Sequence, residues 1–194
     1  MKSSSATTDR ARNTFMTDKK TQRKIIKERL AALTEAEKTS FGRRIAEAAI
    51  TDEHFFAAKR VFVFCSTADE PDTSPIIAAA LSFGKEVFLP RIEGEDMFLI
   101  PYRKNSEMRL NQYGIKEPQG AAYLGKVDLA FVPLLGFDGA RRRLGRGKGY
   151  YDRFLADFDG FSVALAFSAQ ELPEIECDPW DKKPDRILTE KGRI

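Results

Sequence analysis

Residues 127–158 constrain the fold of this 194-residue chain more than any other stretch. An apolar run at 127–135 is followed by a loop at 143–152, in which Gly145, Gly147 and Gly149 alternate with the cations Arg146 and Lys148. Apolar side chains then recur at helical spacing between residues 150 and 158. The pattern predicts a buried strand, a glycine-rich loop and an amphipathic helix, in that order.

The composition of this loop indicates binding of a polyanion, most simply a phosphate chain. Glycines let successive backbone N–H groups approach a ligand closely, and a helix start adds free amide groups and a positive dipole. The loop is not a Walker A motif, which would need Gly at 142 and Ser or Thr at 149, where this chain has Arg and Gly. The spacing of its glycines also differs from the dinucleotide fingerprint. The alternative is an ordinary basic surface turn.

The charge distribution favours a small anionic ligand over a long nucleic-acid track. The chain has 32 basic and 29 acidic residues, for a net charge of +3. The basic residues cluster at 19–29 and 141–153. Cys65 and Cys177 show no metal-ligand or disulfide spacing, which suits a reducing cytoplasm, and no apolar run is long enough to span a membrane. The single histidine, His54, is expected to be structural, so no histidine base is expected.

Helical and strand patterns alternate along the chain. Capping signals at Asp18, at the Thr34 and Glu37 pair and at Ser74-Pro75 predict helix starts. Strands are expected at 60–65, 86–90, 97–102, 129–133, 161–167 and 186–189. This alternation predicts an α/β fold with three layers, α/β/α, and a mainly parallel sheet. Residues 18–194 are expected to form a single domain, and the Ser/Thr-rich residues 1–17 a disordered extension.

Residues 144–152, together with 133–138, closely resemble the 5-formyltetrahydrofolate cyclo-ligase (5,10-methenyltetrahydrofolate synthetase) family. Further matches run from Lys19 to Glu190. The resemblance implies a Rossmann-like fold similar to the NagB/RpiA/CoA-transferase-like fold. It also implies a cytoplasmic, monomeric ligase that acts on ATP and 5-formyltetrahydrofolate with Mg²⁺, without nucleic-acid or membrane partners.

The resemblance also implies roles for individual residues. Lys148 and Arg146 are the expected catalytic residues. The ATP-binding set is Lys19, Arg23, Arg143, Leu144, Gly145, Arg146, Gly147, Lys148, Gly149, Tyr150 and Tyr151. The substrate-binding set is Cys65, Glu70, Ile92, Tyr113, Arg146, Gly147, Lys148, Gly149 and Tyr150. Asp152 and Asp185 are the expected metal ligands.

Some of these assignments have competitors in the sequence. Lys20 is an alternative to Lys19, and Asp181 is a less favoured alternative to Asp185. Gln22 stands where an apolar residue is expected before Arg23, which affects the register of this match. For Cys65 packing is favoured over chemistry, and for Tyr113 an ordinary loop position is as well supported as stacking on a pterin.

The expected reaction is ring closure of 5-formyltetrahydrofolate to 5,10-methenyltetrahydrofolate, with release of ADP and phosphate. The resemblance implies that the formyl oxygen attacks the γ-phosphorus, after which N10 attacks the activated carbon. The alternatives are an ATP-dependent ligase with another substrate, a non-catalytic nucleotide-binding relative, and a nucleic-acid-binding protein that uses residues 141–148 as a basic arm.

Overall fold

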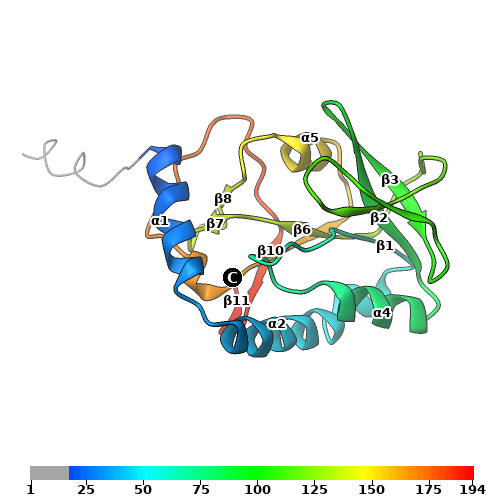
Figure 1. The fold of residues 1–194 in the computed structure, drawn as a ribbon, viewed down its shortest axis with the longest axis horizontal. Coiled ribbons are helices and arrows are strands. Elements are labelled where there is room, and N and C mark those ends of the chain that lie inside the picture. The colour runs from blue at the N-terminus through cyan, green and yellow to red at the C-terminus, as the bar shows by residue number, and fades with distance from the viewer. Residues whose placement is uncertain (1–17) are drawn as a thin grey trace, which may run out of the picture.

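The structure is a computed structural model that describes residues 18–194 (Figure 1). The expectation for residues 1–17 lies outside the described residues. A seven-stranded sheet has the order β11-β10-β9-β6-β1-β2-β3. Its strands are β1 Arg60–Val63, β2 Glu86–Glu93, β3 Asp96–Tyr102, β6 Leu129–Pro133, β9 Phe161–Leu165, β10 Arg186–Thr189 and β11 Gly192–Arg193.

The five central strands, β10 to β2 in the sheet order, are parallel to one another. The edge strands β3 and β11 are antiparallel to their neighbours. The carboxyl ends of the parallel strands therefore share one edge of the sheet, where α/β proteins bind ligands. The prediction of a mainly parallel α/β sheet is confirmed.

Helices cover both faces of this sheet. They are α1 Lys19–Ala31, α2 Glu35–Ile50, α3 Glu53–Ala57, α4 Ser74–Ser82 and α5 Tyr150–Ala156. Figure 1 shows α2 and α4 on one side of the sheet and α5 on the other. Strand β1 explains why: Val61 and Val63 pack in the core with α1 to α4, whereas Phe62 packs with Leu155 of α5. A strand covered on both faces is apolar without alternation, as the sequence predicted.

The predicted helix starts are confirmed. The Asp18 carboxylate accepts a hydrogen bond from the Thr21 N–H at 2.6 Å. Thr34 and Glu37 form a reciprocal capping box, in which each side chain accepts from the other residue's backbone N–H. These caps fix where α1 and α2 begin.

Two short hairpins were not predicted. One joins β4 Met108–Leu110 to β5 Lys116–Pro118, and the other joins β7 Gly136–Phe137 to β8 Arg143–Leu144. Strand β2 also extends three residues beyond its predicted end, to Glu93, because it pairs with β3 along its whole length. The β4–β5 and β7–β8 hairpins both contribute to the site described below.

Candidate active site

The β7–β8 hairpin delivers the glycine-rich loop to the carboxyl edge of the sheet. The Leu135 N–H donates to the Leu144 carbonyl at 2.8 Å, so the chain returns beside the end of β6 before the loop begins. Gly147 and Gly149 have φ angles of 94° and 72°, the left-handed region that other residues rarely adopt. The backbone of this loop therefore requires glycine at 147 and 149, two of its three alternating glycines.

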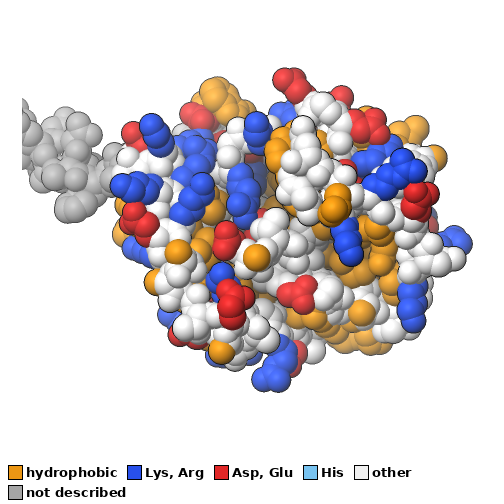
Figure 2. Space-filling model, viewed as in Figure 1, with side chains coloured by type: hydrophobic (Ala, Val, Ile, Leu, Met, Phe, Trp, Pro, Cys, Tyr) orange, Lys and Arg blue, Asp and Glu red, His pale blue; other side chains and the backbone are white. Residues whose placement is uncertain are grey.

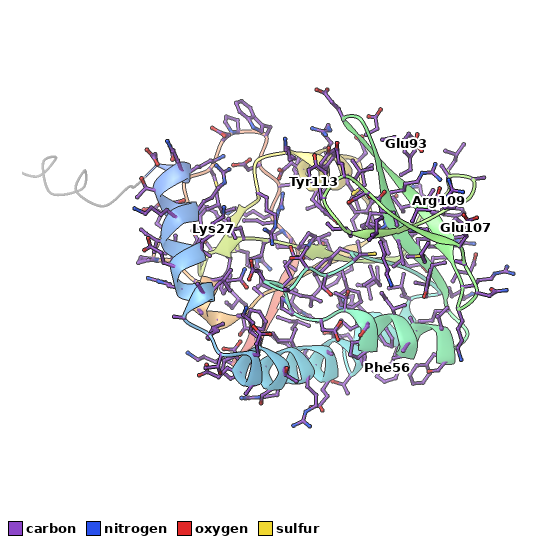
Figure 3. The ribbon with its side chains drawn as sticks, viewed as in Figure 1. Lys27, Phe56, Glu93, Glu107, Arg109 and Tyr113 are labelled. Atoms are coloured by element: carbon purple, nitrogen blue, oxygen red, sulfur yellow. The ribbon has the colours of Figure 1, made fainter. Side chains whose placement is uncertain are left out.

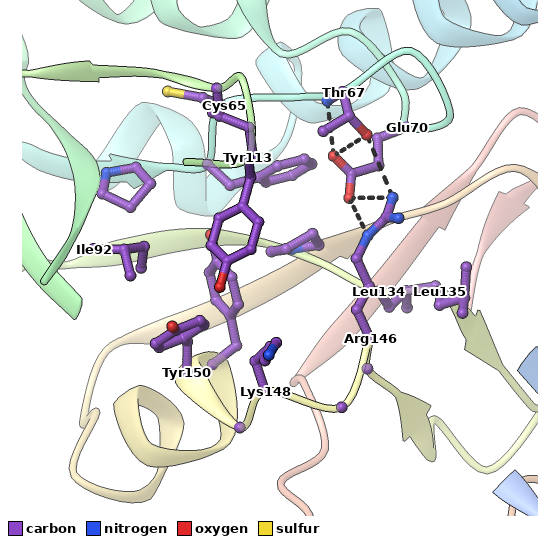
Figure 4. A pocket seen from close by; sticks show the side chains of 18 of the residues that line it. Cys65, Thr67, Glu70, Ile92, Tyr113, Leu134, Leu135, Arg146, Lys148 and Tyr150 are labelled. Carbon is purple, nitrogen blue, oxygen red and sulfur yellow. Dashed lines mark hydrogen bonds and ion pairs between the residues drawn. The ribbon is translucent and has the colours of Figure 1, made fainter. Parts of the chain in front are cut away.

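One side of the loop lines a largely apolar cavity of about 390 Å³ (Figure 4). This volume is within the range typical of small-molecule sites. We call it the apolar cavity; among its lining residues are Cys65, Thr67, Glu70, Pro90, Ile92, Asn111, Tyr113, Glu117, Pro133, Arg146, Lys148, Tyr150 and Tyr151. All the residues predicted to bind substrate lie in this lining.

The wall opposite the loop comes from β1, β2 and the β4–β5 hairpin. In Figure 4 the Tyr113 side chain extends from this wall toward Tyr150 and Lys148 of the loop side. Burial raises the pKa of the Cys65 thiol to about 11, and the nearby Glu117 carboxylate adds to the shift. A thiol with so high a pKa is a poor nucleophile, which agrees with a packing role for Cys65.

Glu70 is held by the protein itself. One carboxylate oxygen accepts from the Thr67 N–H at 2.8 Å and hydroxyl at 3.0 Å, and the other pairs with the Arg146 guanidinium at 3.0 Å (Figure 4). Arg146 therefore spans from the glycine-rich loop to the loop that follows β1. The two residues predicted to contact substrate and phosphate are partners of each other in this structure.

The other side of the loop lines a second cavity of about 550 Å³, which we call the cationic cavity. Its lining residues are Lys19, Arg23, Arg143, Leu144, Gly145, Gly147, Gly149, Asp152, Arg153, Ala156, Asp178, Trp180, Asp181 and Lys182. Five of these residues, Arg143, Gly145, Gly147, Gly149 and Asp152, also line the apolar cavity. Figure 2 shows Lys and Arg side chains gathered over α1 and beside the neighbouring hollow.

Helix α1 supplies the outer wall of the cationic cavity. Arg23 Nε donates to the Gly145 carbonyl at 3.0 Å, and Lys19 lies one turn earlier on the same face. Lys20 is exposed and lines a separate open hollow on α1 with Lys24 and Lys27 (Figure 3 labels Lys27). Of the two competing lysines, only Lys19 is placed in the cationic cavity.

Gln22 was a departure from the expected apolar residue, and the structure explains it. Its side chain is 2% exposed, and its amide donates to the Glu174 carbonyl at 3.0 Å. Its amide oxygen accepts from the Glu176 N–H at 3.2 Å. Gln22 thus fastens the segment 174–176 to α1, a role that an apolar residue could not fill.

Arg143 and Asp152 form an ion pair behind the loop, in which Arg143 is buried and Asp152 is partly exposed. The Arg143 guanidinium is almost fully buried and donates to the Asp152 carboxylate and to the Pro133 carbonyl. Its Nε has no hydrogen-bond partner among the described residues. Arg143 was predicted to contact ATP. It lines both cavities, and its ion pair also holds Asp152, which lines both as well.

Asp185 is not near Asp152, which corrects the predicted metal pair. Its carboxylate accepts from the Ser162 N–H at 2.8 Å and hydroxyl at 2.6 Å, at the amino end of β9. The site lies at the carboxyl end of the parallel strands, so Asp185 faces the wrong edge of the sheet. Asp181, the less favoured alternative, lines the cationic cavity with Asp152.

Three other residues that were predicted to contact ATP are packed or hydrogen-bonded within the protein. Tyr151 packs against both halves of the core and lines only the apolar cavity, and burial raises its pKa well above the ordinary value. Leu144 is buried within β8. The Tyr150 hydroxyl donates to the Gly94 carbonyl at 3.0 Å, which ties the loop to the β2–β3 turn.

Glu117 and Trp180 are among the cavity-lining residues that sequence reasoning missed. Glu117 is 6% exposed and accepts from the Ile92 N–H at 3.1 Å and the Asn111 amide at 2.7 Å, so it fixes the floor of the apolar cavity. It lies in the 113–118 segment that carries the resemblance, which was the available signal. Trp180 lines the cationic cavity, and no periodicity marked it. None of the helices among residues 18–194 is long and apolar enough to cross a membrane.

These features define an α/β protein with a glycine-rich, cationic loop shared between an apolar cavity and a cationic one. A sequence profile of the 5-formyltetrahydrofolate cyclo-ligase family matches residues 15–190. The chain belongs to this family, and it is an enzyme of the ligase class.

Individual relatives agree with the profile. The chain is 33% identical over 182 residues to the 5-formyltetrahydrofolate cyclo-ligase of Mus musculus, covering 85% of this chain and 90% of the relative. The Escherichia coli cyclo-ligase is 30% identical over 175 residues, covering 85% and 96%. The solution structure of the Aquifex aeolicus 5,10-methenyltetrahydrofolate synthetase superposes with a TM-score of 0.80 at 31% identity, covering 90% of this chain and 91% of that one.

Proposed function

We propose that the chain closes the ring of 5-formyltetrahydrofolate to 5,10-methenyltetrahydrofolate, using ATP and Mg²⁺ and releasing ADP and phosphate. The observation that carries the proposal is that a single loop lines two cavities, one apolar and one cationic. A folate in the first and a triphosphate in the second would meet at residues 145–152. The family membership supports the choice of folate as substrate.

The apolar cavity would orient the folate ring system. Its tyrosines, Tyr113 and Tyr150, offer flat faces for a pterin, and Ile92 supplies an apolar contact. Glu70 could accept hydrogen bonds from the pterin ring if Arg146 moves toward phosphate, since Arg146 currently occupies one of its oxygens. Binding of both substrates would thus exchange the Glu70–Arg146 pair for two substrate contacts.

The cationic cavity would hold the triphosphate. Gly145, Gly147 and Gly149 line it and would offer backbone N–H groups to the phosphates, and Lys19 and Arg23 approach from α1. Lys148 lies on the apolar side of the same loop, where the transferring phosphoryl group would meet the formyl oxygen. Its charge is suited to stabilising the oxygens of that group.

Asp152 and Asp181 are the candidates to hold Mg²⁺. The described residues contain no cluster of three or more side chains that could bind a metal by themselves. A magnesium ion bound with a nucleotide needs only one or two carboxylates, because phosphate oxygens and water complete its shell, so the two aspartates fit. The ion would neutralise charge on the triphosphate; Arg143 and Lys19 position the two carboxylates.

The reaction then requires the protein to align the formyl oxygen with the γ-phosphate, and no covalent intermediate with the protein is needed. The formyl oxygen attacks the γ-phosphorus and ADP leaves, which turns the amide oxygen into a good leaving group. N10 attacks the activated carbon and loses its proton to solvent, the C–O bond breaks, and phosphate departs with the former formyl oxygen. Phosphoryl transfer depends mainly on positioning and electrostatic stabilisation, which the loop, Arg146 and Lys148 would supply.

The proposal predicts a product that can be observed directly. Purified protein with 5-formyltetrahydrofolate and Mg-ATP should form the methenyl product, detected by its near-ultraviolet absorbance and by chromatography. Omission of ATP or chelation of Mg²⁺ should abolish it. Binding of ATP without product would contradict the folate substrate and favour a ligase with another substrate.

The revised metal pair makes a separate prediction. Asp152→Asn and Asp181→Asn should each raise the Mg²⁺ concentration needed for half-maximal activity, because each removes a negative charge from the cationic cavity. Asp185→Asn is the matched control, since its carboxylate contacts only Ser162 among side chains. A magnesium titration that shifts for Asp185→Asn and not for Asp181→Asn would contradict this assignment.

A further inference from the structure

Trp180 is an exposed aromatic side chain in the cationic cavity, and the reaction described above does not use it. It is the only tryptophan in the chain, and 67% of its surface is exposed. Among the described residues that line this cavity it is also the only aromatic one. Leaving so large an apolar face in water forgoes the stabilisation that burial would give. An exposed indole at a ligand cavity therefore suggests a ligand that covers it.

The turn that carries Trp180 is anchored at both ends. The Asp181 N–H donates to the Asp178 carbonyl at 3.0 Å, and the Asp178 N–H donates to the Asp181 carboxylate at 2.8 Å. Lys19 Nζ contacts both carboxylates, at 2.5 Å and 2.6 Å. Pro179 restricts the backbone directly before the tryptophan. The indole is thus presented by a fixed turn that is paired with Lys19, a cation of the phosphate-binding side of the cavity.

The position of the phosphate-binding groups indicates what the indole would contact. The loop glycines, Lys19 and Arg23 form the part of the cavity suited to phosphates. The rest of the lining consists of charged side chains, the aliphatic residues Leu144 and Ala156, and Trp180, which is the only aromatic residue among these described residues. A nucleotide bound by its phosphates therefore has a single aromatic surface on which its base could stack.

We infer that Trp180 is the stacking platform for the base of the nucleotide, and so determines affinity for the nucleoside half of ATP. The inference rests on the proposed function in that it places ATP in the cationic cavity. Stacking of a base on an aromatic side chain tolerates different bases, because every base has a π face. The platform should therefore distinguish nucleotides from inorganic polyphosphate much more strongly than adenine from guanine.

The single tryptophan makes the test direct. Mg-ADP and Mg-tripolyphosphate are titrated into the full chain while tryptophan fluorescence is recorded, and the affinities are measured by calorimetry. Mg-ADP should change the emission, and tripolyphosphate should not. Trp180→Ala should raise the Kd for Mg-ADP roughly 5- to 100-fold and leave that for tripolyphosphate unchanged, while Trp180→Phe should keep most of the affinity. Leu124→Ala, at a position 93% exposed and absent from both cavity linings, is the control.

Two results would overturn the inference. One is unchanged Mg-ADP affinity in Trp180→Ala. The other is an equal loss for Mg-ADP and tripolyphosphate, which would mean that the turn acts only by positioning Lys19. These outcomes are separate from failure of the proposed function. Formation of the methenyl product without an emission change on addition of Mg-ADP would contradict the stacking role alone. An emission change without methenyl product would contradict the folate reaction and keep Trp180 as the stacking platform.

Discussion

Lys148 and Arg146 are neighbours in the loop but differ in what holds their charges. Arg146 is paired with Glu70 at 3.0 Å, whereas the Lys148 ammonium has no ion-pair or hydrogen-bond partner within residues 18–194. A charge without a protein partner at a cavity wall is available to a ligand from the outset. Lys148 is therefore the residue whose loss should affect the chemical step most directly.

Lys148→Ala should lower kcat by about 10²- to 10³-fold, the effect typical of removing one donor aimed at developing charge. The KM for the folate should change much less. Steady-state kinetics at saturating Mg-ATP measure both constants, with Lys104→Ala, an exposed lysine outside both cavities, as the control. A kcat near that of the wild type would remove Lys148 from the chemical step.

The two cysteines should differ in reactivity. Burial raises the Cys65 pKa to about 11, so at pH 8 only about one molecule in a thousand carries its thiolate, and Cys177 is exposed. Iodoacetamide at pH 8 should alkylate Cys177 at least about tenfold faster than Cys65, as peptide mass spectrometry would show. Equal rates would mean that the wall of the apolar cavity around Cys65 opens readily.

Helix α1 shows how an element can be predicted while its functional contacts are not. Its cap and apolar spacing were readable because they are local, and Ile26 and Leu30 are buried as expected. The role of Gln22 depends on residues 174–176, more than 150 positions away in sequence, so no local pattern contains it. The choice between Lys19 and Lys20 likewise required knowing which side of α1 faces the loop.

The α1 geometry predicts different consequences for those two lysines. Lys19→Ala should weaken ATP binding by about tenfold or more, because it removes a charge from the cationic cavity and frees the turn at 178–181. Lys20→Ala should leave ATP affinity nearly unchanged, since Lys20 lines the separate hollow on α1. Calorimetric Kd values for both variants test this, and the reverse order would mean that α1 is rotated in the ATP complex.

The difference between local signals and long-range contacts also explains which other elements the sequence predicted. Apolar runs of four or more residues predicted β1, β6 and β9 at the centre of the sheet, and the alternating glycines predicted the loop. The β4–β5 and β7–β8 strands have only two or three residues each, too short for a periodic signal. The segment 174–185 has no regular structure, so its sequence could not show that Asp181 reaches the site and Asp185 the opposite edge.

At the scale of the whole molecule, Asp52 links elements that are far apart in sequence. It caps α3 by accepting from the His54 N–H at 2.9 Å, and it pairs with Arg186 of β10. Burial alone would raise its pKa, but the His54 hydrogen bonds and the Arg186 charge outweigh burial and lower it. His54 stacks on Phe161 with ring centroids 3.5 Å apart, a structural role as predicted.

Asp52→Asn should reduce the free energy of unfolding by about 3 kcal/mol at neutral pH, because it removes the buried carboxylate that pairs with Arg186 and leaves Arg186 with the longer, 3.8 Å contact to the exposed Glu53. A lowered pKa means that the Asp52 contribution is present above the unfolded-state value, near 4, and is lost as pH falls through the folded-state value. Urea unfolding at neutral and acidic pH should therefore show the difference between the wild type and Asp52→Asn shrinking below about pH 4. A difference that grows on acidification would contradict the sign of this shift.

The shared loop is the central feature of the whole molecule, since it would bring the formyl oxygen of one cavity against the γ-phosphate of the other. The most direct test is the fate of that oxygen. With 5-formyltetrahydrofolate labelled with heavy oxygen in its formyl group, the released phosphate should carry the label, as mass spectrometry would show. Methenyl product accompanied by unlabelled phosphate would mean that the formyl oxygen never attacks phosphorus, and would contradict the account.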